Sequence, residues 1–190
     1  MLHDRQGDPE DVITRYIGAS KKFEIDVIVR ITADCPCPSP EITQILLETH
    51  FLEGADYSAS KKCAAGSGTE IYNVSSLEKV INLLGAAKHS EYMTWYMRNN
   101  PDLFSLNIVD LPEEMIRDYR LTVDYQEDLD MFNLLFNKLE EESLTPNLIN
   151  IFKIMDENPD ISKINNSMQL IFQTDKELIR VLDKETKINL

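Results

Sequence analysis

A run of β-branched residues at 27–32 constrains the fold of this 190-residue chain most strongly, because helical segments flank it on both sides. The run shows little alternation of apolar and polar residues, which is typical of a strand covered on both faces, as in a parallel sheet. A helix is predicted next, since Ser39 can cap it, Pro40 can occupy its first turn and Gly54 can end it. A strand-like segment at 55–58 then completes the order of a βαβ unit.

The rest of the chain also alternates strands and helices before becoming wholly helical. The first helix is predicted to start with Asp8 as its N-cap and Pro9 at its first position, and to run to residue 22. Strand patterns are predicted at 71–74, 103–109 and 119–123, and helices at 75–84, 90–99 and 126–142, with a further helix starting at Thr145. The chain after that point is expected to be helical and polar. One domain is expected from the length.

Charge and hydropathy exclude several classes of protein. The chain has 33 Asp and Glu against 19 Lys and Arg, a formal charge of −14. Nucleic-acid binding is not expected, because affinity for phosphate backbones comes mainly from clustered Lys and Arg. No apolar run approaches the roughly 20 residues that cross a bilayer, and the first eight residues lack the apolar region of a signal peptide. A cytoplasmic protein without membrane contact is therefore expected.

Three cysteines, Cys35, Cys37 and Cys63, do not indicate a disulfide framework, because their number is odd. Cys35 and Cys37 could together offer two thiolates to a metal, but a tetrahedral zinc site needs two more ligands. The three histidines are scattered without ligand spacing. Three reduced thiols are the simpler expectation.

Two aspartates follow strand-like runs, the position at which open α/β sheets bind their ligands. Asp34 follows the run at 27–32, and Asp124 follows the run at 119–123. Mg²⁺ is often held by one or two carboxylates together with phosphate oxygens and water. Two such aspartates at one crevice would therefore make a metal-nucleotide site. The simpler alternatives are a turn aspartate at Asp34 and, at Asp124, a capping box with Glu127 for the helix that follows.

At these aspartates the sequence resembles the acylneuraminate cytidylyltransferase superfamily, and in particular its spore-coat polysaccharide biosynthesis (SpsF-like) branch. The resemblance covers roughly residues 7–141, and its motifs occur in the family's order. They are GDPEDV at 7–12, RY at 15–16, RITADCP at 30–36, PEI at 40–42, GADY at 54–57, SLE at 76–78, MT at 93–94, YMR at 96–98, NP at 100–101, RLTVD at 120–124 and EDL at 127–129.

The resemblance implies an α/β fold: a three-layer, nucleotide-diphosphosugar-transferase-like (Rossmann-like) mixed sheet. It implies transfer of CMP from CTP to an acidic, nonulosonic-type sugar, with release of pyrophosphate, by a homodimer. Asp34 and Asp124 match family positions that hold Mg²⁺, the expected cofactor. Arg30 and Arg120 are the nearby basic groups expected to stabilise phosphate charge. Because neighbouring strand residues alternate faces, either arginine can instead pair with a carboxylate.

Departures from the family pattern lead to a second hypothesis. The family begins with a strand and a Gly-rich basic loop around the CTP phosphates, and no match to that segment is found in this sequence. We therefore expect an N-terminally truncated fold: a cytidylyltransferase-like α/β domain at 1–142 and a helical extension at 143–190, to which no chemistry is assigned. The alternative to an enzyme is a non-catalytic scaffold or oligomerisation protein. Single departures occur at Ala33, Tyr72, Tyr92 and Tyr125.

Overall fold

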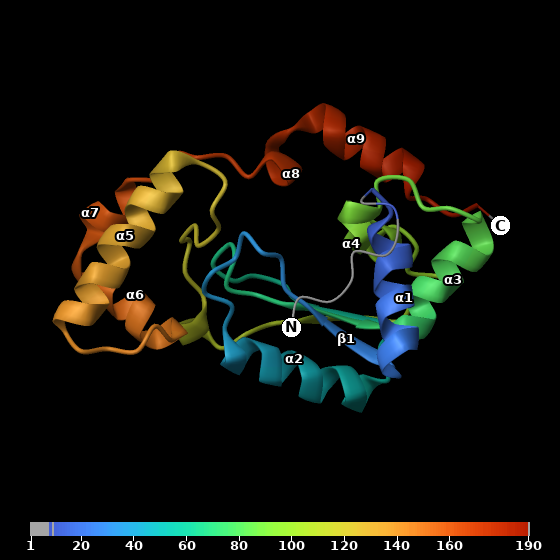
Figure 1. The fold of residues 1–190 in the computed structure, drawn as a ribbon, viewed down its shortest axis with the longest axis horizontal. Helices are drawn as coiled ribbons and strands as arrows, with labels where there is room; N and C mark the ends of the chain where they lie inside the picture. Colours follow the sequence, from blue (N-terminus) through green and yellow to red (C-terminus); the bar gives the residue numbers. More distant parts are fainter. Residues whose placement is uncertain (1–7, 9, 190) are drawn as a thin grey trace.

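The computed structural model describes residue 8 and residues 10–189, apart from the side chain of Phe172. Its centre is a four-stranded mixed sheet with the order β1-β3-β2-β4 (Figure 1). The strands are β1 (Val27–Arg30), β2 (Tyr57–Ser60), β3 (Glu70–Asn73) and β4 (Leu106–Val109). β3 runs antiparallel to both β1 and β2, whereas β2 and β4 are parallel. The predicted mixed α/β fold is confirmed.

The predicted strand, helix and strand unit is present in a split form. α2 (Pro40–Glu53) connects β1 to β2. These two strands point in the same direction, but β3 lies between them. The caps of α2 are those expected: the Ser39 hydroxyl accepts a hydrogen bond from the backbone N–H of Ile42, and Gly54 ends the helix in the left-handed conformation at φ 59°. Local signals therefore fixed both ends of this helix correctly.

Two apolar cores lie on the two faces of the sheet. Ile42 and Leu46 of α2 belong to one core, which also contains Ile71 of β3. The other core joins the sheet to α1 (Val12–Phe23), α3 (Val74–Leu84) and α4 (Met93–Arg98), and the short 3-10 helix η1 (Ser90–Tyr92) directly precedes α4. This arrangement gives three layers, helix, sheet and helix, as the resemblance implies.

The C-terminal third is helical; it begins beyond one end of the strands and continues on the side of the sheet opposite α2 (Figure 1). After the 3-10 helix η2 (Glu113–Met115), its elements are α5 (Gln126–Glu141), α6 (Leu148–Glu157), α7 (Pro159–Lys163), α8 (Ile171–Thr174) and α9 (Lys176–Glu185). α5, α6 and α7 share the core of α2, whereas Ile188, after α9, packs into the core of α1, α3 and α4. The C-terminal segment thus contacts both ends of the domain. The division predicted at residues 142 and 143 stays a prediction.

Several predicted boundaries are wrong. α1 begins at Val12 with Asp11 as its N-cap, while the Asp8 side chain accepts from the backbone N–H of Glu10 in the preceding turn. Pro9 lies outside the described residues. The strand predicted at 119–123 does not form. This segment makes a single bridge, between Arg120 and Ala65, and adds no strand to the sheet.

The helix predicted from Thr145 begins instead at Leu148, since Asn147 caps it by accepting from the N–H of Asn150.

β1 has an apolar core on each face, since Ile28 belongs to one core and Val27 packs against the other, but it is not part of a parallel ladder. In the described structure it pairs on one side only, with β3, and the pairing is antiparallel. Val29 is 38% exposed and Ile31 is 47% exposed. β1 is therefore an edge strand with apolar side chains in solvent, a feature that usually marks a surface for further pairing.

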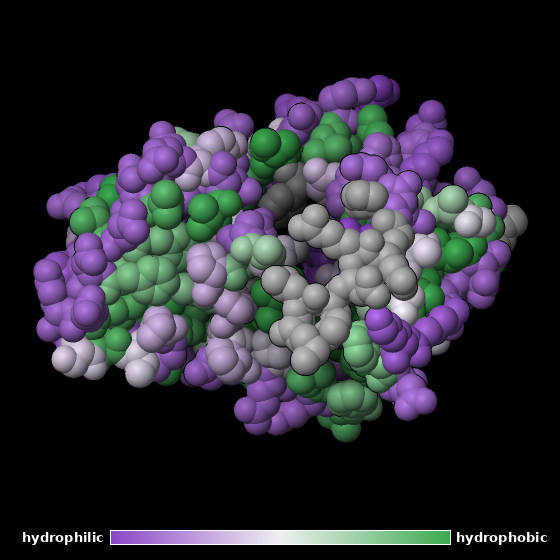
Figure 2. Space-filling model, viewed as in Figure 1, coloured by the Kyte–Doolittle hydropathy of each residue, from purple (hydrophilic) through white to green (hydrophobic). Residues whose placement is uncertain are grey.

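Apolar residues also gather on the outer surface of the C-terminal helices. Figure 2 shows them in green over the part of the molecule formed by α5, α6 and α7, with hydrophilic residues around them. Leu129, Leu134 and Phe136 of α5 and Ile149 of α6 are exposed large hydrophobic residues. None of the helices in the described part of the chain has the length and apolar character that a membrane span requires.

Candidate active site at the carboxyl end of β1

The structure brings Asp34 and Asp124 to one place. The hydroxyl oxygen of Thr122 lies 3.2 Å from Oδ2 of Asp34 and 3.5 Å from Oδ2 of Asp124. The backbone is also joined here, because the N–H of Val123 donates to the carbonyl of Asp34 over 2.8 Å. The two strand-end aspartates therefore converge on one hydroxyl, the juxtaposition that sequence spacing alone left open.

The loop after β1 holds Asp34 in its ionised form. Partial burial alone would raise the pKa of the Asp34 carboxyl, but hydrogen bonds from Thr32, from Thr122 and from its own backbone amide lower this pKa below the usual value. The thiol of Cys35 also points at this carboxylate, with its sulfur 3.7 Å from Oδ1. Cys37, by contrast, is buried in the core, and burial raises the pKa of its thiol to about 11.

Asp124 is held by Arg120. One guanidinium nitrogen, Nη2, lies 2.5 Å from Oδ2 of Asp124, and the Asp124 side chain remains 46% exposed. Asp124 does not act as the cap of α5, contrary to the capping-box alternative. The cap comes from inside the helix, because the carboxylate of Asp128 accepts from the backbone N–H groups of Asp124 and Tyr125 at 2.9 and 3.0 Å. The helix start thus leaves the Asp124 carboxylate available for other ligands.

Asp128 is a functional candidate that the sequence reading missed. It is fully buried and makes a two-pronged ion pair with Arg120, with Nε at 2.7 Å and Nη2 at 3.0 Å. Burial would raise the pKa of the Asp128 carboxyl, but Arg120, the Asp124 amide and Asn165 lower it to about 2. Its sequence signals are its place in the EDL motif at 127–129 and its position three residues after Tyr125, where a carboxylate can cap a helix from N3.

The Arg120 side chain is only 6% exposed and lies between two carboxylates. Its remaining nitrogen, Nη1, is buried and has no hydrogen-bond partner in the described chain. The arginine therefore fixes the geometry of Asp124 and Asp128, and in this conformation it presents no donor to a ligand in solvent. The expectation that Arg120 stabilises phosphate charge stays a prediction.

Arg30 also pairs with a carboxylate, which is the alternative to a phosphate-binding role that the sequence leaves open. Its Nη1 lies 2.6 Å from Oε2 of Glu70, which also accepts from the hydroxyls of Tyr57, Tyr72 and Thr94. Burial alone would raise the pKa of the Glu70 carboxyl, but the Arg30 charge and these hydroxyl donors hold it below its usual value. Glu70 begins β3 opposite Arg30, so the cluster lies at the same edge of the sheet as Asp34.

The donor set of the converging aspartates fits Mg²⁺. Both ligands are carboxylates, and Asp124 is half exposed, which leaves room for substrate oxygens and water as this ion prefers. No group of three or more His, Cys, Asp and Glu side chains suited to a metal occurs among the described residues. Among the described residues, the two carboxylates would therefore need substrate oxygens and water to complete the coordination of the ion.

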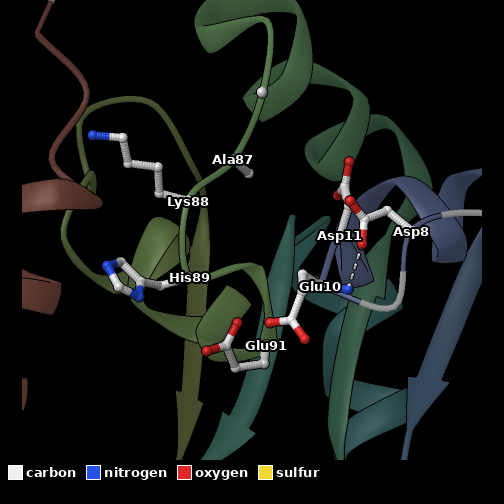
Figure 3. Close-up of a pocket in the computed structure, with 8 residues that line it drawn as sticks. Asp8, Glu10, Asp11, Ala87, Lys88, His89 and Glu91 are labelled. Atoms are coloured by element: carbon white, nitrogen blue, oxygen red, sulfur yellow. Dashed lines mark hydrogen bonds between the residues drawn. The ribbon is translucent and has the colours of Figure 1, made fainter.

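Two surface pockets lie away from this pair. One, of about 400 Å³, lies between Ile31 and α2, and both apolar and polar residues line it. The other, of about 310 Å³, lies before α1 and carries the carboxylates of Asp8, Glu10, Asp11 and Glu91. Figure 3 shows Lys88 and His89 on the opposite side of this second pocket from Asp8 and Asp11. Its acidic lining does not suit a polyphosphate, because like charges repel.

A family model described as cytidylyltransferase matches residues 2–179, and the chain belongs to this family. It is 27% identical over 157 residues to the spore coat polysaccharide biosynthesis protein SpsF of Bacillus subtilis, which covers 82% of this chain and 65% of SpsF. It is 30% identical over 165 residues to an uncharacterized protein of Methanocaldococcus jannaschii, covering 86% of this chain and 67% of that protein.

A solved structure shares the fold. The cytidylyltransferase from Leptospira borgpetersenii superposes with a TM-score of 0.73 at 24% identity, covering 86% of this chain and 68% of that one. This chain thus spans about two thirds of the length of the curated relatives it matches. The predicted superfamily and SpsF-like branch are confirmed, while the preference for an acidic sugar and the truncation stay predictions.

Proposed function

We propose that this chain takes part in transfer of CMP from CTP to an acidic sugar during surface polysaccharide biosynthesis, releasing pyrophosphate. The observation that carries the proposal is the convergence of Asp34 and Asp124 on the Thr122 hydroxyl. Membership of the cytidylyltransferase family and similarity to a spore coat polysaccharide biosynthesis protein support it.

In this reaction a sugar oxygen attacks the α-phosphorus of CTP, and the bond from that phosphorus to the pyrophosphate oxygen breaks. Negative charge builds on the phosphate oxygens and must be offset. When bound, Mg²⁺ would supply that offset. Asp34 and Asp124 would hold the ion. Thr122 orients the Asp34 carboxylate, and Arg120 occupies one oxygen of Asp124, Oδ2.

A non-catalytic scaffold is the second candidate, and one observation favours it. Both arginines that the sequence offers for phosphate are already paired with carboxylates, Arg30 with Glu70 and Arg120 with Asp128. A scaffold keeps these pairs as structural links and has no affinity for nucleotide.

Titration calorimetry with CTP, with and without Mg²⁺, separates the two candidates. We expect binding that requires Mg²⁺ and that weakens at least about 100-fold in Asp34→Asn, since losing even the partner of a metal ligand costs about 10- to 100-fold. Asp130→Asn is the matched control, because Asp130 is an exposed carboxylate of α5 whose partner is Gln126. A folded chain that binds no CTP under either condition supports the scaffold.

A homodimer is part of the proposal. The exposed Leu129, Leu134 and Phe136 of α5 and the open edge of β1 are surfaces that a second copy would cover. Light scattering on the purified chain tests this, and a monomer at all concentrations would contradict it.

A further inference from the structure

Asn165 reaches from the C-terminal segment into the candidate site. It follows α7 and is fully buried, although the next two residues, Asn166 and Ser167, are exposed. Its Nδ2 donates to the backbone carbonyl of Arg120 at 3.0 Å and to Oδ1 of Asp128 at 2.8 Å. Both partners are acceptors, so the amide nitrogen must face them and the orientation of the side chain is settled.

The contacts continue from Asn165 to the metal candidate. Asp128 Oδ1, which accepts from Asn165, also accepts from Nε of Arg120. Arg120 in turn donates through Nη2 to both Asp128 and Asp124. A buried hydrogen-bonded chain thus runs from Asn165 through Asp128 and Arg120 to the carboxylate of Asp124.

The guanidinium of Arg120 and a metal ion compete for the same carboxylate. As long as Asp128 is held in its two-pronged pair, Arg120 offers Asp124 one nitrogen only. If Asp128 loses its amide donor, the guanidinium is freer to turn toward Asp124 and to take both of its oxygens, a geometry that arginine favours. Less of Asp124 is then available to a cation.

We propose that Asn165 is a positioning residue, which sets the metal affinity of the Asp34 and Asp124 pair by holding Asp128 and Arg120 in place. The inference rests on the proposed function, since it needs a cation at these carboxylates. It assigns a role to a segment in which the sequence offers no candidate for chemistry. It also explains why a buried amide lies 37 residues beyond the carboxylate it contacts.

Mn²⁺ is the probe, since its free form is counted directly by electron paramagnetic resonance. The full chain is titrated with Mn²⁺ in the presence of CTP, as wild type, Asn165→Leu and Asn166→Leu. Asn165→Leu removes the amide at similar volume, and Asn166→Leu makes the same change at the exposed neighbouring residue. We expect about tenfold weaker Mn²⁺ binding in Asn165→Leu, as for other partners of metal ligands, and no change in Asn166→Leu.

Asn100→Leu separates positioning from a purely structural role, because it also removes a buried amide, but one that binds Thr186 and Ile188 instead of Asp128. Positioning weakens Mn²⁺ binding in Asn165→Leu and leaves it unchanged in Asn100→Leu, whereas equal losses in the two variants indicate general damage to the fold and would overturn the inference. If Asn165→Leu does not fold, as judged by its thermal transition, Asn165→Ser makes the same test with a smaller change. Wild-type Mn²⁺ affinity retained in the folded variant overturns the inference and leaves the proposed function standing. A wild-type chain that binds no Mn²⁺ overturns both.

Discussion

The backbone N–H of Val123 donates to the carbonyl of Asp34 over 2.8 Å. This single bond joins two loops far apart in the sequence and places their aspartate side chains next to each other. Because the contact is between backbone atoms, it survives a change of either side chain. Variants of Asp34 and Asp124 can therefore be made with little disturbance of the loops themselves.

Gly66 packs against the backbone of Leu121, in the loop that carries Asp124. Gly66→Ala should therefore be among the most destabilising small substitutions in the chain. A Cβ on Gly66 would lie 2.1 Å from the backbone oxygen of Leu121, and its φ of +87° is strained for alanine. We expect a loss of about 3 kcal/mol or more in the free energy of unfolding, from strain and overpacking together. Urea unfolding measures it.

Gly54→Ala is the matched control for this prediction. Gly54 also has a positive φ, +59°, but its Cβ would meet nothing within 4 Å. Gly54→Ala should lower the free energy of unfolding by only about 1 to 2 kcal/mol, because alanine is strained in the left-handed conformation. Equal losses in the two variants would show that the contact with Leu121 is unimportant.

Arg120→Met should also destabilise the chain, because it leaves the fully buried Asp128 carboxylate without its ion-pair partner. Removing one partner of a buried pair costs about 3 to 5 kcal/mol. Arg117→Met is the comparison, since Arg117 makes a well-formed but exposed pair with Asp156. Chemical denaturation of the two variants should show a large loss for Arg120 and little change for Arg117. A small loss for Arg120 would contradict the buried pair.

Glu70 predicts a pH dependence of stability. Its pKa in the folded chain lies below its usual value. An unfolded glutamate titrates near about 4.3. The stabilisation from Glu70 is therefore fully present above that pH and is lost as the pH falls through the folded pKa. Glu70→Gln should melt at a lower temperature than wild type at pH 7, and the difference should shrink toward pH 3. Parallel melting curves over this range would refute the prediction.

Asn100 should hold the end of the chain in place. Its side chain donates to the carbonyl of Thr186 at 2.9 Å and accepts from the N–H of Ile188 at 2.8 Å. Asn100→Leu removes both bonds at a buried position, so hydrogen exchange at residues 182–188 should accelerate. Exchange in α5 provides the internal reference and should stay slow. Equal acceleration in both segments would indicate global destabilisation instead.

Local signals in the sequence located the helices, and α2 is the clearest example. Ser39, Pro40 and Gly54 act within a few residues of the ends they define, so their meaning does not depend on the rest of the fold. The residues at 119–123 show the opposite case. Their pattern suits a strand, but whether a strand forms depends on which segment lies beside it, and here only Ala65 offers a bridge.

The sequence predicts the two carboxylates of the candidate site, but it does not predict the buried residues that hold them in place. Asp34 can be chosen because a carboxylate that follows a strand points to a known edge of such folds, whereas the strand predicted before Asp124 does not form and a single bridge at Arg120 places this segment instead. Asn165 gave no comparable signal, since one amide in a polar helical tail looks like any other until its burial is known. The sequence does not single out Asp128 for a related reason, because Glu127 is an equally plausible capping residue. Only the structure shows that the Asp128 carboxylate accepts from the backbone at the start of α5.

The contact between Asn165 and Asp128 also links the candidate site to local opening elsewhere in the chain. Proteins open locally in cooperative units. Because Asn165 follows α7 and donates to Asp128 of α5, an opening of the segment after α7 withdraws the amide from this carboxylate. The order of the candidate site therefore depends on a segment that lies outside it.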